Sequence, residues 1–212
     1  MKAFWNERYA GSEFAYGKDP NEFLAAECHR IKPGRVLCLA EGEGRNASFL
    51  ALKGFSVTAV DQSTQGLKKT KKLGKELGVE ITTIEADLEN FEIAPSYWDA
   101  IVSISAHLPP SIRKKVHQQV VGGLKPGGTL ILEAYTKKQL EIPAVGGPPA
   151  SQKEMFMSLP ELEIELAGLN FVIGQETERH FNEGKYHQGL SAVVQVVAER
   201  AAKKLYSIQD AN

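Results

Sequence analysis

The chain has 212 residues, and 25 lysine and arginine side chains against 26 aspartates and glutamates give it a net charge of −1. This length fits a single globular domain, and the balanced charge argues against a general nucleic-acid binder, which usually carries a basic excess. Neither cysteine, Cys28 or Cys38, stands in a disulfide framework or a metal-ligand spacing. No apolar run approaches the ~20 residues of a membrane span, and no targeting segment is visible. We therefore expect a cytoplasmic protein without a metal site, with one domain over residues 1–200 and a polar, partly helical tail over 201–212.

Strand-like and helical stretches alternate along the first two thirds of the chain. The sequence predicts strands over residues 35–39, 56–60, 80–85, 97–105 and 129–134. The predicted helices cover residues 46–53, 63–77 and 111–124, the last with Ser111 as its N-cap. Alternation of this kind is typical of right-handed βαβ units with a parallel sheet. Residues 34–135 thus form the expected core, after a lead-in segment over residues 1–33.

The pattern changes after residue 136. Residues 137–157 hold three prolines and two glycines, and we expect a lid loop there. A helix over 159–168 follows, and then strands over 171–180 and 186–198, which a short turn at 182–185 joins into a hairpin within residues 170–198. The seven strand candidates predict a doubly wound, mostly parallel sheet of the Rossmann-like α/β class, with one antiparallel strand near the C-terminal end.

A glycine-rich turn follows the first predicted strand and precedes a helix. Its Gly42 and Gly44 allow the backbone to approach a ligand closely, and the helix behind them offers free N–H groups. Read as a dinucleotide fingerprint, the turn runs Gly42-x-Gly44-x-x-Ala47, which alone is a weak signal. Glu41 and Glu43 flank these glycines, and two carboxylates suit an ammonium or sulfonium ligand better than a pyrophosphate.

Asp61 ends the second predicted strand, 17 residues after Gly44. An acid at this place binds ribose hydroxyls in either kind of nucleotide site, so it does not separate the two interpretations. The alternative is that Asp61 caps the helix that follows and that the turn is a plain tight connection. That helix is rich in lysine, which predicts a solvated face rather than a nucleic-acid patch.

The stretch over residues 36–46 resembles motif I of the class I S-adenosylmethionine-dependent methyltransferases, and more closely that of their tellurite-resistance (TehB-like) and small-molecule families. In those families the strand is followed by GxGxG and then Arg-Asn. In this sequence the corresponding residues are Ala40-x-Gly42-x-Gly44 and then Arg45-Asn46. The resemblance spans residues 34–135, and residues 5–9 resemble the lead-in helix of those families.

Two positions depart from the family pattern. Cys38 stands where the family usually has an acid on the first strand, and Ala40 stands where it has the first glycine. Because the missing acid commonly helps to hold the methionine amine, Glu41 is the expected substitute.

The resemblance implies S-adenosyl-L-methionine as the methyl donor, bound over the carboxyl ends of the strands, with S-adenosyl-L-homocysteine as product. Asp61 would bind the ribose hydroxyls with Gln62 beside the adenine, and Asp87 with Leu88 would take the adenine amino group. The other implied cofactor-binding residues are Ala40, Glu41, Gly42, Gly44, Asn46, Ser105 and Ala106.

Three residues are the predicted catalytic contacts to the methyl acceptor. His107 directly follows the fourth strand, where acceptor groups lie in this fold, with a packing role as the alternative. If the last strand is antiparallel, the hairpin lies on the cofactor side. Arg179 and His187 are then candidates for binding an anionic or oxyanionic acceptor, with a plain surface hairpin as the alternative.

We interpret the chain as a methyltransferase for a small molecule such as a thiol, a chalcogen oxyanion or a similar nucleophile. It is expected to act as a monomer or homodimer, with no nucleic-acid or membrane partner. Residues 105–110 lack the Asn/Asp-Pro-Pro-Tyr motif that is typical of amino methylation of nucleic-acid bases. An NAD(P)-dependent Rossmann oxidoreductase and a non-catalytic cofactor-binding module stay open as alternatives.

Overall fold

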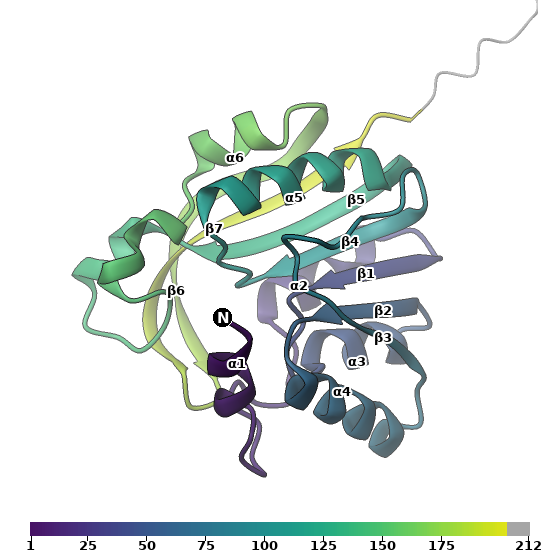
Figure 1. The fold of residues 1–212 in the computed structure, drawn as a ribbon. Coiled ribbons are helices and arrows are strands. Elements are labelled where there is room, and N and C mark those ends of the chain that lie inside the picture. Colours follow the sequence, from purple (N-terminus) through teal and green to yellow (C-terminus); the bar gives the residue numbers. More distant parts are fainter. Residues whose placement is uncertain (203–212) are drawn as a thin grey trace, which may run out of the picture.

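The computed structural model describes residues 1–202, so residues 203–212 of the tail predicted over 201–212 lie outside the described residues. One seven-stranded sheet forms its centre, in the order β3-β2-β1-β4-β5-β7-β6 (Figure 1). The strands are β1 (Arg35–Leu39), β2 (Ser56–Asp61), β3 (Ile81–Glu85), β4 (Trp98–Ile104), β5 (Leu124–Tyr135), β6 (Leu169–Glu183) and β7 (His187–Arg200). β7 runs antiparallel to both of its neighbours, and the pairs among β1 to β5 are parallel. The predicted fold class is therefore confirmed.

Helices cover both faces of the sheet. They are α1 (Lys2–Arg8), α2 (Glu22–Glu27), α3 (Arg45–Leu52), α4 (Thr64–Leu77), α5 (Pro110–Gly123) and α6 (Leu159–Glu165). Alternate residues of β1 separate two apolar layers, as the period of a strand requires. Val36 and Cys38 pack with α2 and α3, whereas Leu37 and Leu39 pack in the layer that includes α5 and α6. Figure 1 shows α5 and α6 side by side on one face.

Local capping explains where the central helices begin and end. The Ser63 hydroxyl accepts a hydrogen bond from the Gly66 N–H at 3.1 Å, and Gly78 ends α4 with a left-handed φ of 70°. The N-cap expected at Ser111 is wrong. Helix α5 begins one residue earlier, at Pro110, because the fixed φ of proline suits the first helical turn.

Two segments outside the sheet complete the described chain. The lead-in contains α1, the unpredicted α2 and a 3₁₀ turn, η1 (Cys28–Arg30). Residues 137–157, called the strap below, contain the 3₁₀ turns η2 (Lys137–Glu141) and η3 (Ala150–Met155). Val145 ties the strap to β7 through two backbone hydrogen bonds with Gln188, at 3.2 and 2.9 Å. Within residues 1–202, no helix is both long and apolar enough to cross a membrane.

Candidate active site at the carboxyl ends of the strands

The strand order reverses between β1 and β4, and both strands end in strained backbone. Ala40 follows β1 with a φ of 48°, and Ser105 follows β4 with a φ of 55°. Left-handed conformations are unfavourable for non-glycine residues and gather at functional sites. In open α/β sheets, ligands bind outside the carboxyl ends of the strands at this reversal. These two residues therefore mark the two sides of the candidate site.

The glycine-rich turn is packed closely from two directions. Gly44 has a φ of 90°, and a Cβ on it would lie 2.7 Å from the Cα of Thr70 in α4. Gly42 has a φ of 67°, and a Cβ there would lie 2.7 Å from the hydroxyl of Tyr9. The lead-in residue Tyr9 thus covers the turn at the place where a ligand of the carboxyl ends would lie.

Asp61 lies at the end of β2 and faces this turn, as predicted. Its Oδ2 accepts the Gly42 N–H at 2.8 Å, and its Oδ1 accepts the Ser63 N–H at 2.7 Å. The carboxyl group is only 6% exposed, and burial raises its pKa even though these two hydrogen bonds act in the opposite direction. The next side chain, Gln62, has a buried Oε1 with no partner among residues 1–202.

Glu41 and Glu43 are not equivalent. Glu41 lies beside Cys38, and its Oε1 accepts the Ala47 N–H at 2.8 Å. Burial raises the pKa of Glu41 to about 7, against the Ala47 N–H and the nearby Arg45 charge, which lower it. Glu43 instead binds the Lys69 ammonium at 2.7 Å and accepts the Ala15 N–H at 2.8 Å. The expectation of two carboxylates available to a ligand is therefore corrected to one, because Lys69 neutralises Glu43.

The other predicted cofactor residues divide into two groups. Ala106 and Leu88 are buried, and Leu88 lies in the apolar layer around α5. Asp87 is exposed just after β3, and its carboxylate accepts the Glu89 N–H at 3.1 Å. Asn46 turns toward the lead-in, because its Oδ1 accepts the Asn21 N–H at 2.9 Å. The structure brings Ala40, Glu41, Gly42, Gly44 and Asp61 together at the turn, and Asn46 faces the other way.

His107 connects the ends of β4 and β5. Its Nε2 accepts the Tyr135 N–H at 3.0 Å, and its Nδ1 lies 3.1 Å from the Ser105 carbonyl oxygen. These partners require a neutral ring that carries its proton on Nδ1. Burial lowers the pKa of His107 to about 4. Both ring nitrogens are thus engaged by backbone groups.

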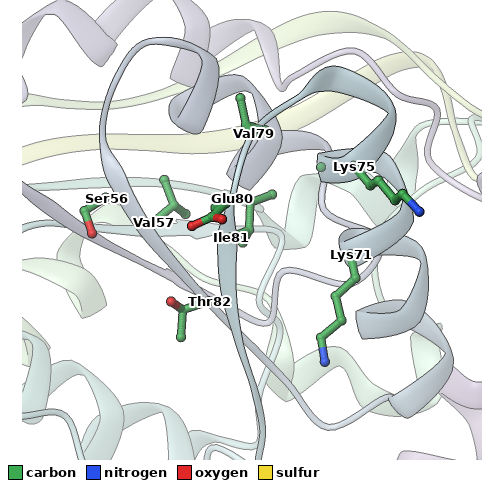
Figure 2. Close-up of a pocket in the computed structure, with 9 residues that line it drawn as sticks. Ser56, Val57, Lys71, Lys75, Val79, Glu80, Ile81 and Thr82 are labelled. Atoms are coloured by element: carbon green, nitrogen blue, oxygen red, sulfur yellow. The ribbon is translucent and has the colours of Figure 1, made fainter.

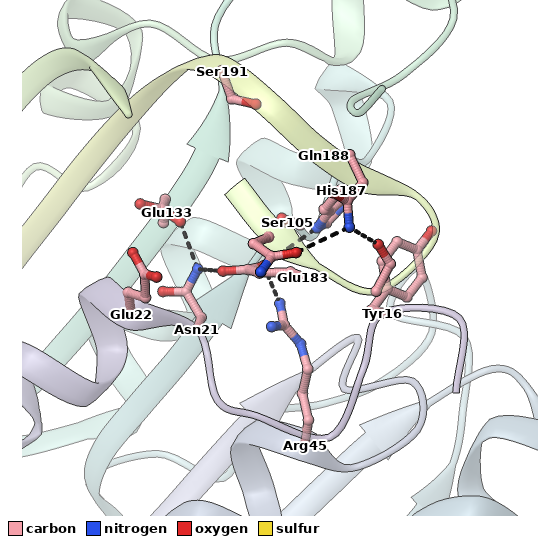
Figure 3. Close-up of polar contacts among 12 residues, drawn as sticks. Tyr16, Asn21, Glu22, Arg45, Ser105, Glu133, Glu183, His187, Gln188 and Ser191 are labelled. Atoms are coloured by element: carbon pink, nitrogen blue, oxygen red, sulfur yellow. Dashed lines mark hydrogen bonds and ion pairs between the residues drawn. The ribbon is translucent and has the colours of Figure 1, made fainter. Parts of the chain in front are cut away.

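Figure 3 shows a network of buried ion pairs and hydrogen bonds. It joins side chains of β5 and β6 to α3 and the lead-in. Arg179 donates two hydrogen bonds to Glu133, at 2.9 and 2.8 Å, and one to Glu183 at 3.0 Å. Arg45 of α3 binds the other oxygen of Glu183 at 2.6 Å, and Asn21 bridges Glu133 and Glu183 at 2.6 and 3.1 Å. Arg179 also binds the exposed Glu22 at 3.1 Å, so three carboxylates pair with two guanidinium groups in this network.

His187 joins the same network through Glu183. Its Nδ1 lies 3.4 Å from Oε2 of Glu183, and its ring lies 4.5 Å from Tyr16 and 5.4 Å from Tyr135, between ring centroids. Burial lowers the pKa of His187, against the hydrogen bond to Glu183. Although burial acts to raise it, the His187 hydrogen bond and the Arg45 charge bring the pKa of Glu183 to about 2.

The sequence analysis missed the two acids and the amide of this network. The signal was present for Glu133, because a single acid within an otherwise apolar strand requires a partner when it is buried. Glu183 and Asn21 carried no such signal, since a hairpin turn and a short lead-in ordinarily hold polar residues. The antiparallel pairing that brings His187 opposite Glu183 was predicted, but its register was not.

A surface hollow lies at the opposite end of the sheet. Figure 2 shows it between the start of β2, at Ser56 and Val57, and the start of β3 at Ile81, with Lys71 and Lys75 of α4 beside it. Because these are the amino ends of the strands, the hollow is separate from the site at the carboxyl ends.

Comparison with known proteins agrees with this arrangement. The family model described as a methyltransferase domain matches residues 36–128, from β1 into β5. This match covers a little under half of the chain and shows that these residues are similar to a methyltransferase domain. The 2-heptyl-1-hydroxyquinolin-4(1H)-one methyltransferase of Mycobacteroides abscessus is 26% identical over 126 residues, which are 58% of this chain and 55% of that protein. The chain thus spans about half the length of this curated relative.

Two solved structures share the fold of this chain. TehB from Haemophilus influenzae superposes with a TM-score of 0.70 at 17% identity, covering 94% of this chain and 66% of that one. A protein from a study of the conversion of a disulfide bond into a thioacetal group during echinomycin biosynthesis gives a TM-score of 0.74 at 16% identity, with 97% and 94% covered.

Proposed function

We propose that the protein transfers a methyl group from S-adenosyl-L-methionine to a small molecule. The observation that carries the proposal is the pair of acids at the glycine-rich turn, with the partly buried Glu41 on one side and the buried Asp61 on the other. A dinucleotide would place its pyrophosphate against these acids, which disfavours the oxidoreductase alternative. A donor with an ammonium and a sulfonium group would be attracted instead.

The side chains at the turn fit such a donor. Each oxygen of Asp61 accepts one backbone hydrogen bond and keeps a lone pair for a ribose hydroxyl. The unpartnered Oε1 of Gln62 suits the adenine amino group, with Asp87 and Leu88 on the other side of the ring. The methionine part would lie against Glu41 and against the backbone of the residues Ala40, Gly42, Gly44, Ser105 and Ala106.

His187 is the proposed general base. The bound donor supplies an activated methyl group, so the protein has to hold the acceptor in line and remove its proton. A proton on Nδ1, held by Glu183, leaves Nε2 of a neutral imidazole to accept the proton from a thiol or hydroxyl group. Arg179 positions Glu183, and His107, with both nitrogens engaged, positions the ends of β4 and β5.

The charge balance of the network bears on the acceptor. A chalcogen oxyanion needs excess positive charge, but the carboxylates of Glu133, Glu183 and the exposed Glu22 already offset the charges of Arg179 and Arg45. A thiol or a similar uncharged nucleophile is therefore the acceptor that we propose. The free thiols of Cys28 and Cys38 support action in a reducing compartment such as the cytoplasm.

Replacing the base tests this proposal. We expect His187→Gln to lower kcat by at least about 100-fold, the usual contribution of a general base, without weakening the binding of S-adenosyl-L-homocysteine. The matched control is His180→Gln, because His180 is exposed on the same hairpin. Methyl transfer would be followed with a panel of thiols and hydroxyl compounds. An unchanged kcat in His187→Gln would exclude His187 as the base.

A further inference from the structure

Tyr135, the last residue of β5, carries a buried hydroxyl group. Its side chain is 0% exposed, and its Oη has no hydrogen-bond partner among residues 1–202. The Ser191 hydroxyl lies beside it and acts to lower the pKa of Tyr135, which burial raises, but Ser191 donates its own hydrogen bond to the Gly189 carbonyl at 3.3 Å. A buried phenol normally finds a partner, because burial removes the hydrogen bonds that its hydroxyl would make with water.

A second unpartnered donor lies where the strap begins. The Oε1 of Gln139 accepts the Ala192 N–H at 2.8 Å, and so continues the β7 ladder past the end of β5. Its Nε2 is buried without a partner in the described part of the chain. Two orphaned donors at the carboxyl end of β5 point to a ligand that accepts hydrogen bonds there.

The strap covers the Tyr135 ring directly. A Cβ on Gly146 would lie 2.2 Å from Oη, and one on Gly147 would lie 3.2 Å from Cγ of the same ring. Met157 at the far end of the strap donates its N–H to the Tyr135 carbonyl at 3.1 Å. The backbone of Gly146 and Gly147, which carry no side chain, therefore covers the Tyr135 side chain.

The walls around the hydroxyl are aromatic and close to the proposed base. The Tyr135 ring lies 5.4 Å from those of Phe181 and His187 and 5.7 Å from that of His107, between centroids. Phe156, from the end of the strap, belongs to the same apolar cluster. Flat rings pack favourably on such walls, and the Tyr135 ring lies next to the ring of the proposed base, His187.

We propose that the methyl acceptor is a small aromatic thiol or phenol, held by the Tyr135 hydroxyl in a place that the strap opens and closes. This inference rests on the proposed function and names its substrate class. The Tyr135 O–H donates to the reacting sulfur or oxygen, and His187 takes the proton of the acceptor. The new bond to the methyl carbon forms as the carbon–sulfur bond of the donor breaks, with its electron pair left on the donor sulfur.

The test compares wild type with Tyr135→Phe. The matched control is Tyr97→Phe, because Tyr97 is an exposed tyrosine just before the start of β4. Thiophenol and 4-nitrophenol are offered as acceptors against cyclohexanethiol and cyclohexanol, and S-adenosyl-L-homocysteine release is measured. We expect wild type to favour the aromatic pair by about tenfold in kcat/KM, and Tyr135→Phe to lose about tenfold. We also expect Tyr135→Phe to raise Tm by about 2–4 °C, because it removes an unpaired buried hydroxyl.

Each arm has a result that overturns the inference. Equal use of the saturated pair, transfer to neither aromatic compound, or full activity in Tyr135→Phe would exclude the proposed acceptor contact. A lower Tm in Tyr135→Phe would show that the hydroxyl is bonded within the fold. Binding of S-adenosyl-L-homocysteine to wild type is measured first by calorimetry. Its absence would contradict the proposed function itself, which separates the two failures.

Discussion

Glu41 is the residue at which stability and ligand binding compete most directly. Its pKa is raised by burial from 4.5 to about 7, so the folded protein binds a proton there that the unfolded chain releases. The charged carboxylate therefore costs stability increasingly as the pH rises from 4.5 through 7. The ammonium group of a bound donor would offset this cost by pairing with the carboxylate. This offset explains why an acid stands beside the buried Cys38.

We predict that Glu41→Gln raises the free energy of unfolding by up to about 3 kcal/mol at pH 8 and leaves it unchanged near pH 4.5. The amide oxygen can still accept the Ala47 N–H, while the buried charge is removed. Urea denaturation across this range measures the effect. The control Glu43→Gln should lose stability at pH 8, because Lys69 loses its carboxylate partner and keeps only the Glu13 carbonyl. A less stable Glu41→Gln at pH 8 would contradict this account of the site.

His107 has the opposite pH dependence. Its pKa is lowered by burial from 6.5 to about 4, so its contribution to stability is lost as the pH falls from 6.5 toward 4. The sequence indicated the position of His107 after β4 but not its bonding. Its partners are the Tyr135 N–H and the Ser105 carbonyl. A pattern of side chains along the sequence does not indicate which backbone groups a histidine will bind. The position of Asp61 was predictable, since it needed only the end of one strand.

The ion network connects elements that are distant in the sequence. Arg179 on β6 binds Glu133 on β5 and Glu183 at the end of β6, and Glu183 in turn binds Arg45 on α3. The hairpin and its antiparallel strand were predictable from alternation and a short turn. The network was not, because it depends on the register that places Arg179 opposite Ser191 and Glu183 opposite His187.

We predict that Arg179→Met destabilises the protein by about 3–5 kcal/mol, because it leaves two buried carboxylates with one guanidinium. Thermal unfolding or urea titration measures this loss. Lys72→Met is the control, since the Lys72–Glu76 pair is exposed and long at 3.9 Å, and should change stability by less than about 1 kcal/mol. If Arg179→Met behaved like the control, the network would not be a stabilising element.

At the scale of the whole molecule, the doubly wound, mostly parallel sheet was predictable because alternating strands and helices admit few topologies. The short helix α2 was missed, since its six residues carry too little periodicity. The coverage of the turn by Tyr9 was also beyond prediction, because it joins segments more than thirty residues apart.

The central claim is that the turn between β1 and α3 binds the methyl donor rather than a dinucleotide. Isothermal titration of wild type and Asp61→Ala with S-adenosyl-L-homocysteine and with NAD tests it most directly. We predict that wild type binds S-adenosyl-L-homocysteine and not NAD, and that Asp61→Ala weakens this binding by at least about tenfold through the loss of ribose hydrogen bonds. Binding of NAD without binding of S-adenosyl-L-homocysteine would contradict the account.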